Sequence, residues 1–240
     1  MKTRYMKITG IALLVLLLAL LTASLGFAEA ESTSYEVTIT NLTDGQPFTP
    51  PLIATHRPST SMFTVGQPAS FELKEIAENG NLAPMLTAVG NDKHVSNFVV
   101  AVAGDPPPLL PGQSVTVTID ESRGGKFLSF ASMLICTNDG FTGLDTVRLP
   151  QVVGETITLY SDAYDAGSEI NTEDFADIVP PCPALTGVPS DDPGTGESNP
   201  ALAENGVIRH HDGIQGIADL DPDIHGWENP VVVVEITRVD

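Results

Sequence analysis

Positively charged side chains are scarce in this sequence, which has 11 Lys and Arg against 31 Asp and Glu and a formal net charge of −20. Between Arg148 and Arg209 there is neither Lys nor Arg, whereas 11 carboxylates fall in that stretch. A surface of this sign repels the phosphates of nucleic acids and the anionic headgroups of lipids. We therefore expect no nucleic-acid partner.

Recognised catalytic motifs are also missing from the sequence. It contains no Gly-x-Ser-x-Gly elbow, no His-Glu-x-x-His pair and no glycine-rich phosphate loop. Paired carboxylates are the groups that glycoside hydrolysis uses, but one Trp and 6% aromatic residues are few for a site that must stack sugars. We expect that the protein is not an enzyme, and a carboxylate-dependent hydrolase is the least favoured alternative.

The first 30 residues have the three-part layout of a secretory signal peptide. Lys2, Arg4 and Lys7 precede an apolar stretch over residues 8–21, and small residues follow as far as Ala30. The layout predicts cleavage after Ala30, and an uncleaved membrane anchor is the alternative because the longer uncharged stretch over residues 8–28 can just reach across a bilayer. No later segment is apolar over such a length, so no membrane span is expected after cleavage. The predicted location is extracellular, or periplasmic in a Gram-negative bacterium.

Only two cysteines occur, Cys136 and Cys182. Because an exported chain meets an oxidising compartment, a disulfide between them is the first expectation. Two separate buried thiols are the alternative. A bridge would join the strand before "TNDGF" to the segment after "YDAGSE".

Apolar and polar residues alternate over most of the chain from Tyr35 onward. Six runs rich in Val, Ile and Thr predict strands: "SYEVTITNLT", "NFVVAVAG", "QSVTVTID", "KFLSFASMLICT", "ETITLYS" and "PVVVVEITRV". Two weaker runs, "PLIATHR" and "LDTVRL", are further candidates. About seven or eight strands joined by turns predict an all-β fold, an antiparallel β-sandwich.

Two other segments interrupt the predicted strands. Residues 71–88 have apolar side chains at helical spacing with Gly80 as a stop, which predicts one or two short helices. Residues 184–201 are rich in Pro, Gly, Ser and Asp, which predicts a long exposed loop. Only 39 residues follow this loop and they include the most strand-like run, so we expect residues 31–240 to form one β-sandwich domain.

An acidic turn, "YDAGSE", follows directly on the predicted strand "ETITLYS". Gly167 allows a tight bend between Asp165 and Glu169, so one loop can offer two carboxylates to one ion. Asp139 lies in the polar turn after "SMLIC", which we expect at the same end of the sandwich. Since calcium prefers hard oxygen ligands, these residues predict a calcium site, and a merely solvated acidic edge is the alternative.

The same two turns resemble those of the spondin N-terminal domain. Members of that family have an Asp-aromatic-Phe-x-Gly-x-Asp turn, then an apolar strand and a Tyr-Asp-Ala-Gly-Thr-Asp turn, to which "DGFTGLD" and "YDAGSE" are similar. The runs "YEVTITN", "PLIATH" and "GWENPVVVVEI" agree with the same family. The resemblance implies a sandwich similar to C2 domains that binds one calcium ion at three acidic positions, which fall on Asp139, Asp165 and Glu169.

Two positions depart from the family pattern. Gly140 stands where animal members have a bulky aromatic residue, so recognition through that side chain is not carried over. Glu169 stands where Asp is usual, with the same charge and one more methylene group. The resemblance therefore implies calcium binding either with a shifted geometry at Glu169 or with one ligand fewer and a correspondingly lower affinity.

Together these features predict a secreted calcium-binding β-sandwich that serves as an adhesion or binding module at a cell surface or in an extracellular matrix. Its cofactor would be Ca²⁺, and its partner would be an unidentified protein or a surface or matrix ligand. A metal-free structural exported domain, whose acids serve solubility, is the main alternative. The sequence does not indicate an oligomeric state.

Overall fold

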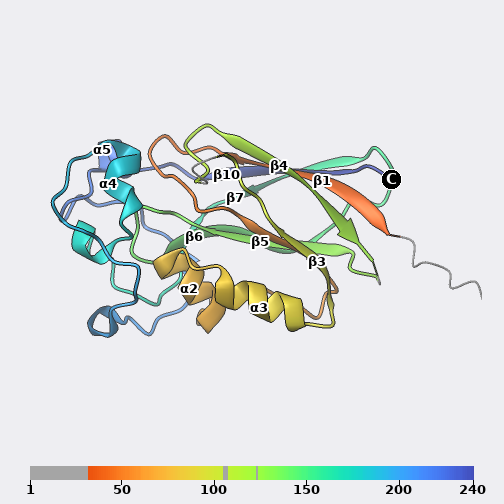
Figure 1. Ribbon diagram of the computed structural model, residues 1–240, viewed down its shortest axis with the longest axis horizontal. Coiled ribbons are helices and arrows are strands. Elements are labelled where there is room, and N and C mark those ends of the chain that lie inside the picture. Colours follow the sequence, from red (N-terminus) through yellow and green to blue (C-terminus); the bar gives the residue numbers. More distant parts are fainter. Residues whose placement is uncertain (1–31, 105–107, 123) are drawn as a thin grey trace, which may run out of the picture. The chain divides into compact units, whose positions relative to one another are not determined.

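Ten strands form two antiparallel sheets in the part of the chain that the computed structural model describes, residues 32–104, 108–122 and 124–240 (Figure 1). The four-stranded sheet has the order β4-β1-β10-β7, with β1 (Thr33–Asn41), β4 (Ser114–Glu121), β7 (Thr156–Ser161) and β10 (Val232–Arg238). The six-stranded sheet has the order β3-β2-β5-β6-β8-β9, with β2 (Leu52–His56), β3 (Val95–Val100), β5 (Phe127–Met133), β6 (Gly140–Arg148), β8 (Ala163–Asp165) and β9 (Arg209–His210). The predicted all-β sandwich is confirmed. The predicted signal peptide, residues 1–30, lies outside the described residues.

The four-stranded sheet follows the period-two pattern of its sequence. In β1, Val37 and Ile39 are fully buried, whereas Glu36 is exposed on the other face. The outer face is rich in Thr, and Thr38 Oγ1 lies 2.8 Å from Thr116 Oγ1 of the neighbouring strand. Alternation of this kind buries one side of each strand and leaves the other in water.

The predicted strand "KFLSFASMLICT" is shorter than expected. β5 ends at Met133, because Thr137 turns the chain back into β6. The Thr137 hydroxyl donates to the Leu134 carbonyl at 2.7 Å and accepts from the Gly140 amide at 2.9 Å. A Cβ atom on Gly140 would lie 2.5 Å from Thr137 Oγ1, so this turn leaves no room for a side chain at position 140.

A pair of helices covers the outer face of the six-stranded sheet (Figure 1). They are α2 (Phe71–Asn79) and α3 (Ala83–Asn91), which confirms the two short helices predicted for this segment. Ser70 caps α2 by accepting a hydrogen bond from the Leu73 amide at 3.2 Å, and Gly80 ends it with a φ of 62°. The fold therefore has three layers, two sheets and a helix pair.

Two apolar clusters fill the spaces between the layers. One lies between the sheets, and its largest fully buried side chains include Ile39, Phe48, Ile53, Phe130 and Leu128. The other lies between the six-stranded sheet and the helices, and includes Leu52, Leu73, Ile76, Met85 and Met133. Because successive residues of β2 point to opposite faces, Leu52 and Ile53 belong to different clusters.

The remaining chain between β8 and β10 forms short helices joined by loops. These are η1 (Phe175–Asp177), α4 (Pro181–Thr186), η2 (Pro200–Leu202) and α5 (Pro222–His225), none of which the sequence analysis predicted. Residues 184–201 begin in the last turn of α4 and contain no buried residue. In the described residues, no helix has both the length and the apolar character needed to cross a bilayer.

The structure contains the predicted disulfide between Cys136 and Cys182, whose Cα atoms are 5.2 Å apart. It joins the turn between β5 and β6 to α4, and both cysteines are fully buried. Gln46 holds the Cys136 backbone from the other side, since its side chain accepts from the Cys136 amide at 3.1 Å. The alternative of two separate thiols is wrong, and the bridge fits an oxidising compartment.

Candidate metal centre

The pairing of β6 with β8 brings Asp139 and Asp165 together at the edge of the six-stranded sheet where β6 begins and β8 ends. Gly140, the first residue of β6, lies opposite Asp165, the last residue of β8. The Ala166 amide then donates to the Asp139 carbonyl at 3.1 Å. Both carboxylates are buried, Asp139 completely and Asp165 to within 1% of its surface.

Asp139 has one satisfied and one unsatisfied carboxylate oxygen. Its Oδ2 atom accepts from the Ser168 amide at 2.7 Å and from the Glu169 amide at 3.0 Å. Its Oδ1 atom is buried and has no hydrogen-bond partner. Burial, with the nearby charge of Asp165, raises the pKa of Asp139 to about 7. Such a buried, unpaired oxygen is costly, so it is a position where a cation would be favourable.

Asp165 is held by three donors. Oδ1 accepts from the Gly167 amide at 2.7 Å, whereas Oδ2 accepts from Asn171 Nδ2 and from Arg209 Nη2, both at 2.8 Å. The turn needs glycine at position 167, because its φ is 67° and a Cβ atom there would lie 2.6 Å from the Val207 amide nitrogen. The tight bend expected in "YDAGSE" is therefore present.

Glu169 is also buried, with 4% of its surface exposed. Its Oε1 atom accepts from the Asn199 amide at 3.2 Å, so the segment before η2 closes over the carboxylate. Burial raises the pKa of Glu169 to about 7; the Asn199 bond opposes the shift, and Glu78, Asp139 and Asp177 reinforce it. The three predicted residues thus lie in two adjacent turns, Asp139 before β6 and Asp165 and Glu169 at the end of β8.

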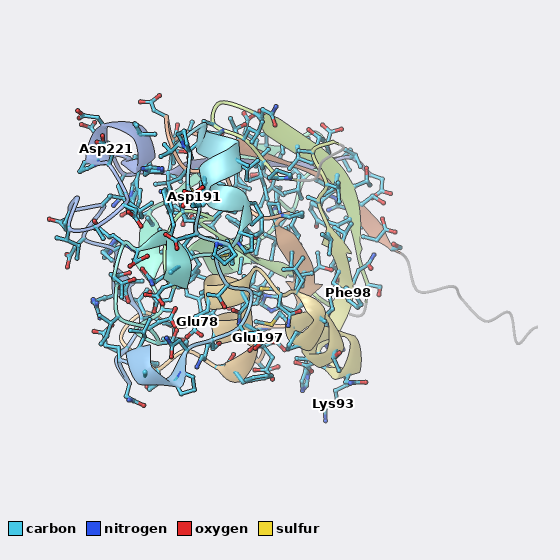
Figure 2. The ribbon with its side chains drawn as sticks, turned by 60° about the vertical axis from the view of Figure 1, so that its left-hand side comes forward. Glu78, Lys93, Phe98, Asp191, Glu197 and Asp221 are labelled. Atoms are coloured by element: carbon cyan, nitrogen blue, oxygen red, sulfur yellow. A yellow bond between two sulfur atoms is a disulfide. The ribbon has the colours of Figure 1, made fainter. Side chains whose placement is uncertain are left out.

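Glu78 is a fourth carboxylate that the sequence analysis missed. It lies in the last turn of α2 and is 4% exposed, and neither of its oxygens has a hydrogen bond. Lys74 Nζ is 3.5 Å from Glu78 Oε1, an ion pair without a hydrogen bond. Figure 2 shows Glu78 near Glu197, and Asn79 Nδ2 donates to Ser198 Oγ at 3.1 Å. An acid at a helix C-terminus opposes the helix dipole, and this unfavourable placement was the one feature of the sequence that could have marked Glu78 as a candidate site residue.

Arg209 is the cation in direct contact with Asp165. It comes from β9, opposite Asp165 in the register, and it also bonds Glu204 at 3.0 Å. In the sequence, Arg209 ends the stretch without basic residues, and its ion pair with Asp165 was not predicted. Because a guanidinium and a metal ion would both use Asp165, the two compete for its charge.

The donor set fits calcium in chemistry and charge. Asp139, Asp165, Glu169 and Glu78 offer hard carboxylate oxygens, three of which, Asp139 Oδ1 and both oxygens of Glu78, accept no hydrogen bond. Asp139, Asp165 and Glu169 do not form a group whose ligand atoms all lie within 4.8 Å of one another. Within the described part of the chain, such groups are Asp174, Asp192 and Asp219, and the disulfide-bonded cysteines with His225.

The chain matches one of the known protein-family models. A family model described as Spondin_N, the spondin N-terminal domain, matches residues 40–173, which is more than half of the 240-residue chain. The matched region includes Asp139, Asp165, Glu169 and Glu78, but not Arg209. A search of curated proteins found no match.

Proposed function

Because the chain belongs to the spondin N-terminal domain family, we propose that it is a secreted calcium-binding module, in which the ion holds together the turns at one edge of the six-stranded sheet. The observation that carries the proposal is the buried Oδ1 atom of Asp139, which has no partner. Asp165 and Glu169 lie close enough to interact electrostatically with Asp139, and Glu78 with Glu169, in a chain with 31 acids and 11 bases. Calcium would cancel the repulsion between these groups and satisfy that oxygen.

Asp139, Asp165 and Glu169 are the residues proposed to hold the ion, and Glu78 adds charge from α2. Asp139 and Glu169 would bind as carboxylates, so calcium would displace the protons that burial retains on them near pH 7. Asn199 and Ser168 position the turn through their hydrogen bonds to Glu169 and Asp139. No step of chemistry on a substrate is assigned to these residues.

We place the module at a cell surface or in an extracellular matrix, where it would bind a protein or matrix ligand. The disulfide, the acidic surface and the family support this role. A metal-free exported domain is the second candidate function, favoured by the Arg209–Asp165 ion pair, which already neutralises one carboxylate. The two candidates differ in whether calcium stabilises the fold.

The decisive measurement is the melting temperature of the secreted protein, first stripped with a chelator and then titrated with calcium in a calorimeter. Binding to the folded state alone raises the melting temperature with calcium concentration. Asp139→Asn should abolish the rise, whereas Asp191→Asn, in the exposed loop, should leave it intact. If calcium does not change the melting temperature of the unmutated protein, the metal-free candidate is correct.

The adhesive role needs a separate experiment. Immobilised protein would be incubated with the surface fraction of the source organism in calcium and in chelator, and bound ligands would be compared. A ligand retained by the unmutated protein and not by Asp139→Asn would support the role. Equal retention by both proteins in both conditions would contradict a calcium-dependent interaction.

A further inference from the structure

A cavity of about 230 Å³ opens between the helix pair and the six-stranded sheet. It shares no residue with the carboxylate group at the sheet edge, and Figure 1 shows α2 and α3 on this side of the six-stranded sheet, with α3 beside β3. Its lining comes from β2, β3, the loop after β2 and both helices, namely Ala54, His56, Thr60, Ser61, Met62, Ser70, Glu72, Met85, Ala88, Val89, Asp92 and Val95. The volume is below the ~300–1,000 Å³ typical of drug-sized sites, so it suits a small ligand.

The inner wall of the cavity is apolar. Met62, Met85 and Val89 are at least 94% buried and belong to the core cluster beneath the helices. Two methionines make this wall adaptable, because the side chain is unbranched and flexible. The lining contains no aromatic residue, so neither sugar stacking nor an aromatic cage for a quaternary ammonium is available. The wall therefore suits a short aliphatic group.

The lining also contains polar side chains and carries negative charge. Glu72 and Asp92 contribute carboxylates, Thr60, Ser61 and Ser70 contribute hydroxyls, and neither Lys nor Arg is present. His56 adds no free donor, since its ring nitrogens lie 2.8 Å from the Arg57 carbonyl and 2.8 Å from Ser129 Oγ. An anionic ligand would be repelled from this lining.

Asp92 is fixed in place as a carboxylate. Its Oδ2 atom accepts from Thr60 Oγ1 at 2.7 Å, and its Oδ1 atom accepts from the His94 amide at 2.8 Å. The His94 bond is the main reason that the pKa of Asp92 lies below its usual value. The adjacent Lys93 is exposed at the outer end of α3 and makes no ion pair with Asp92 in the described structure (Figure 2). Each carboxylate oxygen retains capacity for another donor.

Glu72 is the second acceptor. It lies in the first turn of α2, and its carboxylate makes no hydrogen bond or ion pair with any described residue. Two carboxylates in one cavity lining, without a Lys or Arg beside them there, are complementary to a single positive charge. A primary ammonium ion has three donors and no acceptor, which matches this set of oxygen acceptors.

We propose that this cavity binds a small primary amine, with its aliphatic chain against Met62, Met85 and Val89 and its ammonium group at Glu72 and Asp92. The class includes free short-chain amines and the exposed end of a lysine side chain. The site is independent of the calcium proposal. Binding of the amine in the presence of a chelator would leave the calcium question untouched.

The experiment compares three probes of similar length on the full secreted protein, in chelator at pH 7: n-hexylamine, n-hexanol and hexanoate. Calorimetry should show saturable binding of the amine, and binding of the alcohol and the acid at least about tenfold weaker, the usual difference for one charge-assisted hydrogen bond. Equal binding of hexanol would show that the cavity is only apolar. Absence of amine binding at millimolar concentration would overturn the proposal.

Two variants test the position of the amine. Glu72→Gln removes a charge that has no partner among the described residues, and it should weaken hexylamine binding about tenfold. Because Glu72 lies in the first turn of α2, the melting temperature should fall only slightly. Ala88→Leu fills the cavity and should abolish binding of the amine. Glu228→Gln, an exposed acid outside the lining, is the matched control and should bind like the unmutated protein. Unchanged affinity in both test variants would exclude this cavity.

Discussion

Arg209 Nη2 donates to Asp165 Oδ2 at 2.8 Å, across 44 positions of sequence. The guanidinium is 40% exposed, whereas the carboxylate is almost completely buried. The ion pair therefore joins a partly solvated cation to a carboxylate buried within the acidic group. In the calcium-free protein it provides the positive charge that a metal ion would otherwise supply to Asp165.

Arg209→Gln should lower stability and strengthen calcium binding. Without calcium, loss of the guanidinium leaves Asp165 short of one charged donor, and partial exposure of the pair limits the loss to roughly 1–3 kcal/mol. With calcium, no guanidinium competes for Asp165, so calcium should raise the melting temperature more than in the unmutated protein. Calorimetric scans in chelator and in calcium measure both effects. Arg148→Gln, on the exposed end of β6, is the control, and an identical calcium response in all three proteins would contradict the competition.

The calcium-free protein should lose stability as the pH rises through 7. Burial raises the pKa of Asp139 and of Glu169 to about 7, whereas in the unfolded chain both release their protons near pH 4. Between these values the folded state binds more protons than the unfolded state, so the free energy of unfolding falls with increasing pH. Urea unfolding in chelator at pH 5, 6, 7 and 8 measures the slope.

Asp139→Asn isolates the part of this pH dependence that belongs to the site. Asparagine keeps an acceptor for the Ser168 and Glu169 amides and cannot ionise, so the slope between pH 5 and 8 should become shallower. The variant should also be at least as stable as the unmutated protein at pH 8 without calcium. The same slope in both proteins would show that Asp139 is not the group that titrates.

Gly167→Ala should damage the turn for two separable reasons. Alanine is strained at a φ of 67°, and its Cβ atom would lie 2.6 Å from the Val207 amide nitrogen. Gly154→Ala is the matched control, because Gly154 has a φ of 80° but no atom within 4 Å of the added Cβ. The control measures the backbone strain alone, about 1 kcal/mol, and Gly167→Ala should cost more. Equal losses in chemical unfolding would mean that the turn moves to accept the methyl group.

Removal of the disulfide should destabilise the fold without changing the sheets. The double variant Cys136→Ser, Cys182→Ser should lose about 2–4 kcal/mol of unfolding free energy, since the unfolded chain is no longer constrained. Far-ultraviolet circular dichroism should retain the β signal. A reducing agent should lower the stability of the unmutated protein toward that of the variant, and should leave the variant itself unchanged.

The strands could be predicted because their pattern is local. Each of the six strong runs contains a strand, since alternation of Val, Ile and Thr with polar residues states which face is buried. β8 and β9 have three and two residues, too few for any alternation to be read. The early end of β5 depends on a hydroxyl of Thr137 that bonds across its own turn, which hydrophobic patterning does not register.

The site was predictable only in part for a related reason. Asp139 and Asp165 follow apolar runs, so their place at a sheet edge can be read from the chain, and the turn with Gly167 carries Glu169 beside them. Glu78 and Arg209 arrive from a helix and a two-residue strand that are remote in sequence. Burial of Glu78 depends on the segment around Ser198 that covers the end of α2, and no local pattern contains that information.

The turn between β5 and β6 makes the residue type at position 140 depend on the residue type at position 137. A Cβ atom on Gly140 would lie within 2.9 Å of three Thr137 side-chain atoms, so residue 140 can become aromatic only if residue 137 becomes smaller. Thr137 in turn supplies two of the hydrogen bonds that close the turn. A variant with an aromatic residue at position 140 must therefore change both positions and close the turn by other hydrogen bonds.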